Sequence, residues 1–320
     1  MSKQITYETY LPRDETAILE LFNTSFGKKM NIDFWQWRFK DNPTGQMMVE
    51  LAWDDEILVA HYAISPVILS VNGKDHFTAL SMTTMTHPNY RGRRLFPILS
   101  TRLYERLRLC DYSIVWGFPN YRSHPTFINR LAWDDIYEIP MFTLNVEYLS
   151  ELIKISRCIV ELSIFDEKFD ILWEKVKCDN EIWVKRDQKY LNWRYILNPT
   201  HKYTILAYID NDELLGYAVY KKYYSDIDIV DFVSVQGAII GEELINSIFN
   251  MALLQGDIKR INMWFNLHHP LHGYLERMCF QNNVPVTYLG SKKLDDSKHY
   301  SVDFKNYSNW YLQMGDSDVY

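Results

Sequence analysis

The chain repeats one of its longer stretches: "DFWQWRFKDNPTGQMMVELAWDDEILVAHYAI" (residues 33–64) returns as "KYLNWRYILNPTHKYTILAYIDNDELLGYAVY" (residues 189–220). Trp37-Arg38 matches Trp193-Arg194 at a shift of 156 positions (193 minus 37), and Asn-Pro-Thr recurs at the same shift. In both copies an apolar strand follows, then an acidic turn, then a second apolar strand. Asn and Asp suit such turns because their side chains form local hydrogen bonds. Because order and spacing both agree, the repeat indicates two copies of one α+β unit.

The first copy is predicted to alternate between helices and strands. Apolar residues at Ile18, Leu21 and Phe22 give residues 14–26 the stripe of an amphipathic helix. A second helix is expected to end before Pro43, because a residue that precedes proline avoids the helical conformation. The predicted elements are strands at 4–10, 47–53, 56–70, 76–86, 112–118 and 136–144, and helices at 14–26, 31–39, 94–108 and 123–131.

A weaker likeness links residues 115–133 to residues 263–280, each a strand, a polar loop with His-Pro and a short helix. The sequence therefore predicts an α+β protein of two tandem domains. Each would be a mixed, mostly antiparallel twisted sheet flanked by helices. The expected boundaries are 1–149 and 150–300, with a tail at 301–320 that packs on the domains.

Composition narrows the function classes. The 320 residues are 47% hydrophobic and 15% aromatic, as expected of a globular protein. A formal net charge of -7 argues against a nucleic-acid partner, which needs a basic face. No apolar window reaches the length of a membrane span, and the first residues lack the apolar run of a signal peptide. Four scattered cysteines suit a reducing compartment, so a cytoplasmic protein is expected.

One turn concentrates positive charge in this acidic chain. In "HPNYRGRRLF" (residues 87–96), a strand meets a helix through Arg91, Gly92, Arg93 and Arg94. The first N–H groups of a helix carry partial positive charge, so phosphate binds there readily. Arginines add bidentate donors. The turn is therefore predicted to hold a phosphorylated ligand; a solvated strand–helix connection is the structural alternative.

With its flanking strand and helix, this turn resembles the acyl-CoA-binding motif of the GNAT acetyltransferase superfamily, Arg/Gln-x-x-Gly-x-Gly/Ala, whose amides hold the pyrophosphate of coenzyme A. The resemblance covers residues 1–146. The second copy resembles a degenerate GNAT unit of a tandem member, because its counterpart "VSVQGAIIGEELI" (residues 233–245) has no arginine. Only the first copy is expected to bind acyl-CoA. The resemblance implies these cofactor-binding residues: Met85, Thr86, Arg91, Gly92, Arg93, Arg94, Leu95, Phe96 and Asn120.

The sequence departs from the family pattern in three places. Arg94 stands where the motif keeps glycine, and Phe96 stands where it keeps a second small residue. Many GNAT enzymes protonate the departing thiolate with a tyrosine on the fourth helix, but Ile128 occupies that place here. Tyr121 or His124 is the expected substitute, with Tyr137 as a further alternative that spacing does not separate from them.

The resemblance implies transfer of an acetyl group from acetyl-CoA, a co-substrate, to the amine of a small molecule. A backbone N–H near Met85 would stabilise the oxyanion. A protonated alkylamine, of pKa about 10.4, must lose a proton to a base or to water. Glu50, in mid-strand, is the preferred candidate over the turn carboxylates from Asp54 to Glu56. The other candidates lie in the tail, at Asp316, Asp318 or the Tyr320 carboxylate.

Three functions compete. The leading prediction is an N-acetyltransferase for a small amine. The alternatives are an aminoacyl transferase of the peptidoglycan-bridge type, which would want a basic groove for tRNA, and a non-catalytic acyl-CoA sensor. No metal site is predicted, because His268, His269 and His272 lack further ligands at matching spacing. The acceptor, the acyl chain length and the oligomeric state are not encoded in any pattern found.

Overall fold

The computed structural model describes residues 4–45, 47–235, 238–295, 297 and 299–318. The chain forms two compact units. The first comprises Met1–Ile68, His76–Tyr137 and Tyr288–Tyr300, and the second comprises Leu69–Asp75, Glu138–Thr287 and Ser301–Tyr320. Neither unit is one contiguous segment.

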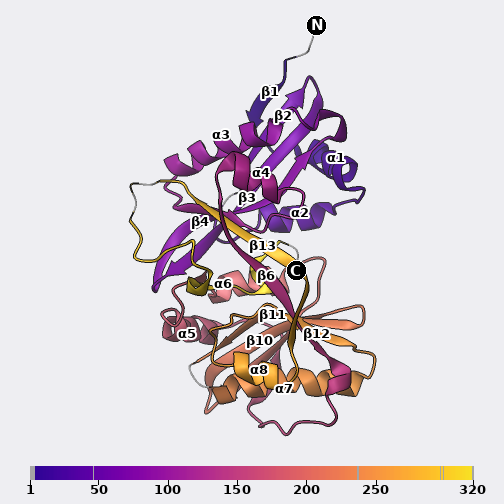
Figure 1. Cartoon of the computed structure of the whole chain (residues 1–320), viewed down its shortest axis with the longest axis vertical. Coiled ribbons are helices and arrows are strands. Elements are labelled where there is room, and N and C mark those ends of the chain that lie inside the picture. The colour runs from indigo at the N-terminus through magenta and orange to yellow at the C-terminus, as the bar shows by residue number, and fades with distance from the viewer. Residues whose placement is uncertain (1–3, 46, 236–237, 296, 298, 319–320) are drawn as a thin grey trace. The chain divides into compact units, whose positions relative to one another are not determined.

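The first unit contains a sheet with strand order β1-β2-β3-β4-β5-β13 (Figure 1). Neighbouring pairs are antiparallel at β1–β2 and β2–β3, whereas β4 and β5 are parallel. Its elements are β1 (Thr6–Thr9), α1 (Glu15–Phe26), α2 (Ile32–Phe39), β2 (Met48–Asp54), β3 (Ile57–Val71), β4 (Lys74–Thr86), a 3-10 turn (Pro88–Tyr90), α3 (Leu95–Leu109), β5 (Ile114–Gly117) and α4 (His124–Leu131). All of the predicted helices and strands of this copy are present, with ends shifted by a few residues.

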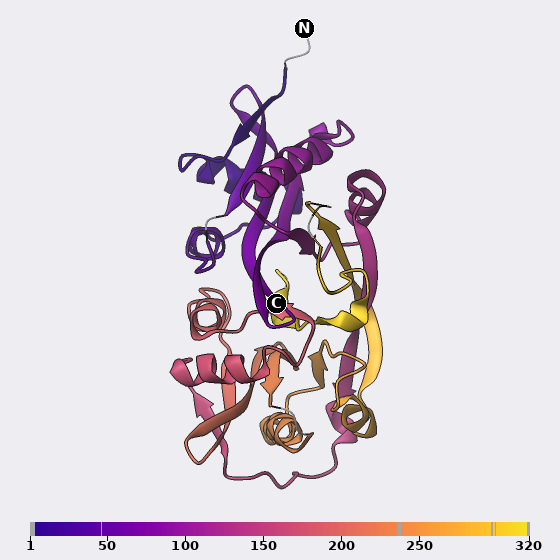
Figure 2. The same cartoon turned by 90° about the vertical axis from the view of Figure 1, so that its left-hand side faces the viewer.

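Helices cover both faces of this sheet. Ile18 of α1 and Trp35 of α2 pack with Leu51 and Ala63 on one face. On the other face, the apolar stripe of α3 packs on alternate residues such as Tyr62. Figure 2 shows the strands between α1 and α2 on one side and α3 on the other. The period-2 pattern of the strands therefore supplies two separate apolar layers.

The repeated Asn-Pro-Thr performs the same task in both copies. The Asn42 Oδ1 accepts a hydrogen bond from the Thr44 N–H at 2.8 Å, and Asn198 accepts from Thr200 at 2.9 Å. Each Asn lies two or three residues after the end of its helical segment and starts the turn into the next strand. The repeat is thus explained by a local hydrogen bond that only a short polar side chain can make.

The second unit has the strand order β6-β12-β11-β10-β9-β7. Strand β8 pairs with β14 and with the tip of the β3–β4 hairpin. Its elements are β6 (Asp134–Asn145), a 3-10 turn (Val146–Tyr148), β7 (Ile159–Leu162), α5 (Glu167–Val176), β8 (Ile182–Val184), α6 (Gln188–Leu191), a π-helical turn (Asn192–Ile196), β9 (Thr204–Asp210), β10 (Glu213–Tyr223), β11 (Asp226–Ser234), α7 (Ala238–Gln255), β12 (Arg260–Met263), α8 (His272–Arg277), β13 (Gln281–Lys293), a 3-10 turn (Tyr307–Asn309), β14 (Trp310–Tyr311) and a 3-10 turn (Met314–Asp316).

The two copies exchange their last strands. Residues 290–293 of β13, from the second copy, pair antiparallel with β5 in the first unit. Residues 142–145 of β6, from the first copy, pair antiparallel with β12 in the second unit. The boundaries 1–149 and 150–300 therefore stay a prediction about the sequence copies, whereas the compact units combine parts of both.

The chain has the predicted α+β architecture, a mostly antiparallel sheet flanked by helices. Residues 310–314 of the tail are almost completely buried within the second unit, at 0–2% exposure. Among the described residues, no helix combines the length and the apolar character that a membrane span requires.

Candidate functional site

The arginine-rich turn joins β4 to α3 and uses two left-handed residues. Gly92 has φ = +81° and Arg94 has φ = +60°. A Cβ atom on Gly92 would meet nothing within 4 Å, so its backbone angle, and not crowding, favours glycine there. Arg94 adopts the same kind of conformation with a full side chain, which costs about 1–2 kcal/mol.

The first turn of α3 leaves its amides available. Arg94 occupies the N-cap position, but its side chain makes no capping hydrogen bond. The backbone N–H groups of Leu95 and Phe96 have no hydrogen-bond partner among the described residues. Pro97 follows, and it has no N–H to satisfy. The positive end of the helix thus remains open for an anion from outside the chain.

A pocket of about 440 Å³ lies at this turn. It collects side chains from the end of α1, the end of β4, the turn, the start of α3, the loop after β5 and α4. Its lining is Ser25, Phe26, Thr84, Met85, Thr86, Tyr90, Arg91, Gly92, Arg94, Leu95, Phe96, Pro97, Asn120, Arg122, Ser123, Thr126 and Arg130. This cavity, here called the arginine pocket, therefore gathers all but one of the nine predicted cofactor-binding residues.

The exception is Arg93, which does not line the pocket. Its guanidinium lies 4.5 Å from the centre of the Tyr90 ring, in a cation–π contact. The Tyr90 hydroxyl in turn donates to the Asp54 carboxylate at 2.5 Å. Arg93 therefore lies outside the arginine pocket, and Asp54 accepts a hydrogen bond instead of being only solvated.

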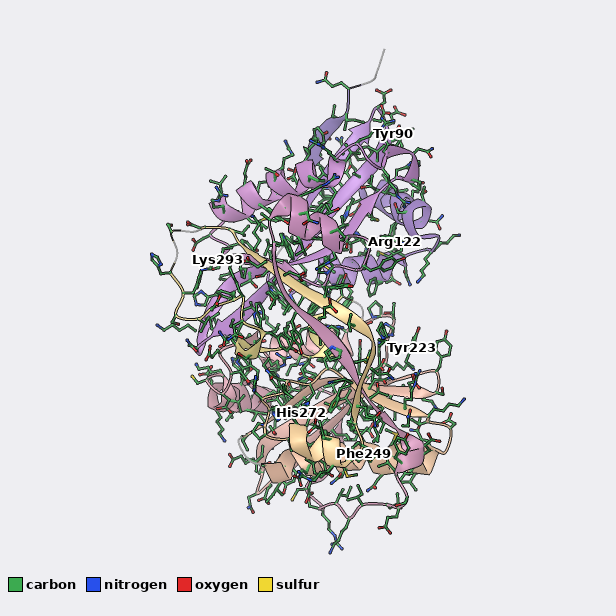
Figure 3. The ribbon with its side chains drawn as sticks, in the orientation of Figure 1. Tyr90, Arg122, Tyr223, Phe249, His272 and Lys293 are labelled. Atoms are coloured by element: carbon green, nitrogen blue, oxygen red, sulfur yellow. The ribbon has the colours of Figure 1, made fainter. Side chains whose placement is uncertain are left out.

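Four arginines line the arginine pocket, and the sequence reasoning found only two of them. Arg91 and Arg94 come from the predicted motif, whereas Arg122 and Arg130 come from the loop after β5 and from α4 (Tyr90 and Arg122 are labelled in Figure 3). The signal for the latter pair was weak, because one arginine in a loop and one on a helix are ordinary surface features. No carboxylate and no histidine stands in the lining, as far as the described residues go.

A left-handed residue in β4, here called the Thr83 bulge, accompanies the end of the pairing with β5 at the site. The parallel pairing of β4 with β5 covers only Ala79–Ser81 and Val115–Gly117. Beyond Ser81, Thr83 takes φ = +50°, and Thr84, Met85 and Thr86 line the arginine pocket instead of continuing the pairing. Such a bulge redirects a strand and ends its ladder. No residue type in the sequence predicts this irregularity at Thr83.

A buried histidine holds the bulge. The Nδ1 of His61, on β3, lies 2.8 Å from the Thr83 carbonyl oxygen, so Nδ1 carries the proton and donates. Burial lowers the pKa of His61 to about 4, and the ring is therefore neutral at pH 7. A histidine within an otherwise apolar strand was the available sequence signal, and it was missed.

The structure does not bring Glu50 to the arginine pocket. This β2 carboxylate is fully buried under α3, where Arg102 donates to it at 2.9 Å and Arg106 forms a second ion pair. Thr9 also donates to it, at 3.2 Å. The geometry gives Glu50 the task of anchoring α3 on the sheet, because its oxygens already serve two guanidinium groups. A role of Glu50 as the base stays a prediction, and the structure places this carboxylate outside the arginine pocket.

The proposed acids lie outside the lining too. The side chain of Tyr121 is exposed, and its hydroxyl accepts from the Arg122 Nε at 2.7 Å. His124 pairs with Asp135 at 3.0 Å and stacks on Tyr288, with ring centres 4.2 Å apart. A buried hydroxyl network instead lies behind Phe96, and sequence reasoning did not find it. Its members are Tyr62, Ser81, Tyr104 and Trp133.

The tail serves the second unit as a structural segment. Arg186 holds the Asp316 carboxylate with two hydrogen bonds of 2.9 and 3.0 Å, and all of these atoms are buried. Arg194 donates to the Gly315 carbonyl at 2.9 Å. Asp316 is therefore an ion-pair partner and not a free base, whereas Asp318 is exposed. Tyr320 lies outside the described residues.

The three histidines of residues 268–272 form no metal site. Within the part of the chain that the structure describes, no group of three His, Cys, Asp or Glu side chains is placed to hold a metal ion. His269 is enclosed by Phe265 and Tyr311, and burial lowers its pKa to about 4. His272 stacks on Phe142. These rings belong to the packing of the second unit.

Comparison with known proteins bears on the fold of the chain. Residues 6–135 match the family model of the acetyltransferase (GNAT) domain. No curated protein matches the sequence at a significant level. Similar solved structures share the fold across 91–92% of this chain at only 12–14% identity.

Three of these structures illustrate the likeness. A conserved protein of unknown function from Enterococcus faecalis, a probable N-acyltransferase, gives a TM-score of 0.71 over 72% of its length. A tandem GNAT protein from the clavulanic acid biosynthesis pathway gives 0.62 over its full length. N-myristoyltransferase of Saccharomyces cerevisiae, with bound myristoyl-CoA, gives 0.61 over 79%. The tandem arrangement of the two copies thus has counterparts in known folds.

Proposed function

We propose that this protein is an acyl-CoA-dependent N-acyltransferase that moves an acetyl group to the amine of a small molecule, because residues 6–135 match the family model of the acetyltransferase (GNAT) domain. The observation that carries the proposal is the arginine pocket, where four arginines surround the uncapped start of α3. A coenzyme A diphosphate satisfies both features, because it is anionic and accepts several hydrogen bonds.

The phosphate end of the ligand is assigned to the turn. The amides after Gly92 point from the positive end of α3, and Arg91 and Arg94 add fixed cations. Each charge-assisted hydrogen bond contributes about 1.5–3 kcal/mol. In this proposal Arg94 takes part as a cation, although its left-handed backbone is better suited to glycine.

The thioester end is assigned to the gap that the Thr83 bulge opens. There the amine attacks the thioester carbonyl, a C–N bond forms, and the C–S bond then breaks to release coenzyme A as its thiol. A backbone N–H near Met85 would stabilise the intermediate oxyanion, and binding both reactants in one pocket supplies orientation. Asn120 and the hydroxyls of Thr84 and Thr126 offer polar contacts there.

Proton transfer follows from what lines the pocket. Since no carboxylate or histidine is found in the described lining, we expect the amine proton to leave through hydroxyls and water. The rate should then rise with pH toward the pKa of the free amine, about 10.4 for an alkylamine. A plateau reached well below pH 8 would instead indicate a dedicated base.

Calorimetry with acetyl-CoA tests the binding step, and the turn provides a matched control. Arg91→Ala should weaken binding by about tenfold or more, since it removes a pocket cation. Arg93→Ala should leave the affinity close to that of the wild type, because this side chain lies on Tyr90 outside the lining. Absence of binding to the wild-type protein would overturn the proposal.

A non-catalytic acyl-CoA sensor is the second candidate function. Ile128 in place of the family's tyrosine, together with a lining that offers no strong acid or base, favours it. Release of free thiol from acetyl-CoA across a panel of small amines separates the two functions. Turnover with any amine supports the enzyme, and tight binding without turnover supports the sensor.

A further inference from the structure

A polar row crosses the sheet of the second unit. Lys221 on β10 lies opposite Asp228 on β11, and Asp228 lies opposite Asn262 on β12. Asn262 in turn lies opposite Thr143 on β6. The Thr143 hydroxyl donates to Asn262 at 3.0 Å, and the Asn262 amide donates to Asp228 at 3.1 Å. Four adjacent strands thus contribute one connected line of polar side chains.

A second row lies two residues along the same strands. Tyr223 is opposite Asp226, and Asp226 is opposite Arg260. The Arg260 guanidinium holds the Asp226 carboxylate with hydrogen bonds of 2.6 and 3.1 Å. Side chains two residues apart on a strand share a face, so both rows occupy one face of the sheet.

The opposite face shows that this polarity is not a general property of the sheet. The intervening residues, such as Ile227, Ile229 and Ile261, are completely buried in the apolar core with Phe249 of α7 (Phe249 and Tyr223 are labelled in Figure 3). An alternating strand normally turns its polar face to water. Here Lys221 and Asp228 are only 5% exposed, and Asn262 is 8% exposed. Lysine and aspartate are seldom buried to this degree.

These side chains line a cavity of about 400 Å³, here called the row pocket. The ring of His201 also lines this cavity. Its pKa is lowered to about 4, chiefly by burial, so the ring is neutral at pH 7. Burial also lowers the pKa of Lys221 and raises that of Asp228, and each of these groups shifts the other back toward its charged form. The complete lining is Met141, Thr143, His201, Lys221, Tyr223, Asp226, Asp228, Arg260, Asn262, Asn283, Val284 and Pro285.

The charges of the row pocket select its ligand. Two cations, Lys221 and Arg260, face two carboxylates, Asp226 and Asp228, so the formal charges of the lining cancel. A ligand with a net charge would bring an uncompensated charge beside the buried Lys221 and Asp228, which is costly. A ligand that carries one charge of each sign would not. Lysine and a carboxylate on adjacent strands lie about 5 Å apart at Cβ, within the reach of such a ligand.

We propose that the row pocket binds a small zwitterion, an amino acid, whose carboxylate faces Lys221 and whose ammonium group faces Asp228. The site lies wholly in the second unit and is separate from the arginine pocket. It does not depend on acyl-CoA binding.

Calorimetry on the full chain without acyl-CoA, using a panel of the standard amino acids, is the direct test. Acetate and methylamine serve as probes that carry only one of the two charges. We expect at least one amino acid to bind, and neither single-charge probe to match it. If no member of the panel binds, or if acetate or methylamine binds as tightly, the proposal is wrong.

Adjacent lysines provide a matched pair of variants. Lys221→Met should weaken amino-acid binding by about tenfold or more. Lys222→Met should have no effect, because Lys222 points away from the pocket lining and pairs with Asp257 at 2.6 Å. Equal affinity in the Lys221→Met variant and the wild type would overturn the assignment and leave the row a structural feature.

Two further variants keep the test decisive if Lys221→Met fails to fold. Asp228→Asn preserves shape but makes the pocket net positive, so it should lose amino-acid affinity and gain acetate affinity. Val284→Trp places a large ring at an exposed position of the lining and should block the ligand without loss of folding. A folded Val284→Trp variant that still binds the amino acid like the wild type would contradict the proposed location.

Discussion

Two pairs of arginines, one in each unit, have opposite roles. In the first unit, Arg91 and Arg94 line an open pocket whose described lining contains no acid. In the second unit, Arg186 and Arg194 are 2% and 1% exposed, and they bind carboxylates and the backbone of the tail. Arg91 and Arg94 thus face a cavity that can hold a ligand, whereas Arg186 and Arg194 stabilise the fold of the second unit.

The pockets at corresponding positions show the same contrast. Strands β11 and β12 are parallel, like β4 and β5, and a pocket of about 650 Å³ lies where they end. Its lining includes Asp179 and Glu181 but no lysine or arginine among the described residues. The backbone therefore provides a pocket in each unit, whereas the side chains decide the charge of what can enter.

The largest expected effect concerns the buried cations of the second unit. Arg186→Met should lower the free energy of unfolding by about 3–5 kcal/mol, because it leaves two buried carboxylates without their counter-charge. Urea titration measures this, with the exposed Arg157→Met as control. A loss below about 1 kcal/mol would show that these charges are not a folding element. Deletion of residues 315–320 should lower the free energy of unfolding by a similar amount, because it removes Asp316 from Arg186. A loss of activity in that variant would therefore not show a catalytic role of the tail.

Acid should destabilise both units through neutral histidines. His61 in the first unit and His269 in the second have pKa values lowered to about 4, from 6.5, chiefly by burial. Between those pH values the unfolded chain binds protons that the folded chain does not. The free energy of unfolding should therefore fall as the pH drops from about 7 to 4, by up to about 3 kcal/mol per histidine.

Single variants divide this acid sensitivity between the units. His61→Asn should lose less stability on acidification than the wild type, and so should His269→Asn. The exposed His299→Gln should keep the wild-type profile. Urea titrations at several pH values give the free energy of unfolding of each protein as a function of pH. If the four curves are parallel, the assignment of neutral buried rings is wrong.

The contrast between the units was only partly predictable from sequence. The repeat and the apolar periodicities gave the elements of the first copy, because those signals are local. The loss of arginine from the second turn was also visible. The exchange of β6 and β13 was not, because strand pairing across the chain leaves no local pattern.

The candidate site, too, was only partly predictable from the sequence. Arg91 and Gly92, which line the arginine pocket, could be proposed from sequence because a strand–turn–helix with these residues has a local physical meaning. The bulge at Thr83 and its partner His61 were missed, since 22 positions (83 minus 61) separate the histidine from the carbonyl that it binds. The ion pairs of Glu50 could not be foreseen, because sequence alone did not show that its strand face lies beneath two arginines of α3.

A charge reversal tests whether the arginine pocket alone carries acyl-CoA. Arg91→Glu with Arg94→Glu should weaken acetyl-CoA binding by about a hundredfold or more, roughly 2.7 kcal/mol, with little change in folding. In the second unit, Asp179→Lys with Glu181→Lys should leave both the affinity and a stoichiometry of one unchanged. A second bound equivalent in the wild type, or unchanged affinity in the reversed pocket, would remove the distinction between the two copies.

The smallest expected effect separates the backbone of Arg94 from its charge. Arg94→Gly should raise the free energy of unfolding by about 1 kcal/mol, because glycine adopts φ = +60° without strain. Arg93→Gly, at a neighbouring position without a positive φ, should instead destabilise. If Arg94 binds phosphate, Arg94→Gly should weaken acetyl-CoA binding despite its greater stability. If Arg94→Gly raises both the free energy of unfolding and the affinity for acetyl-CoA, then Arg94 does not contribute to binding of the cofactor.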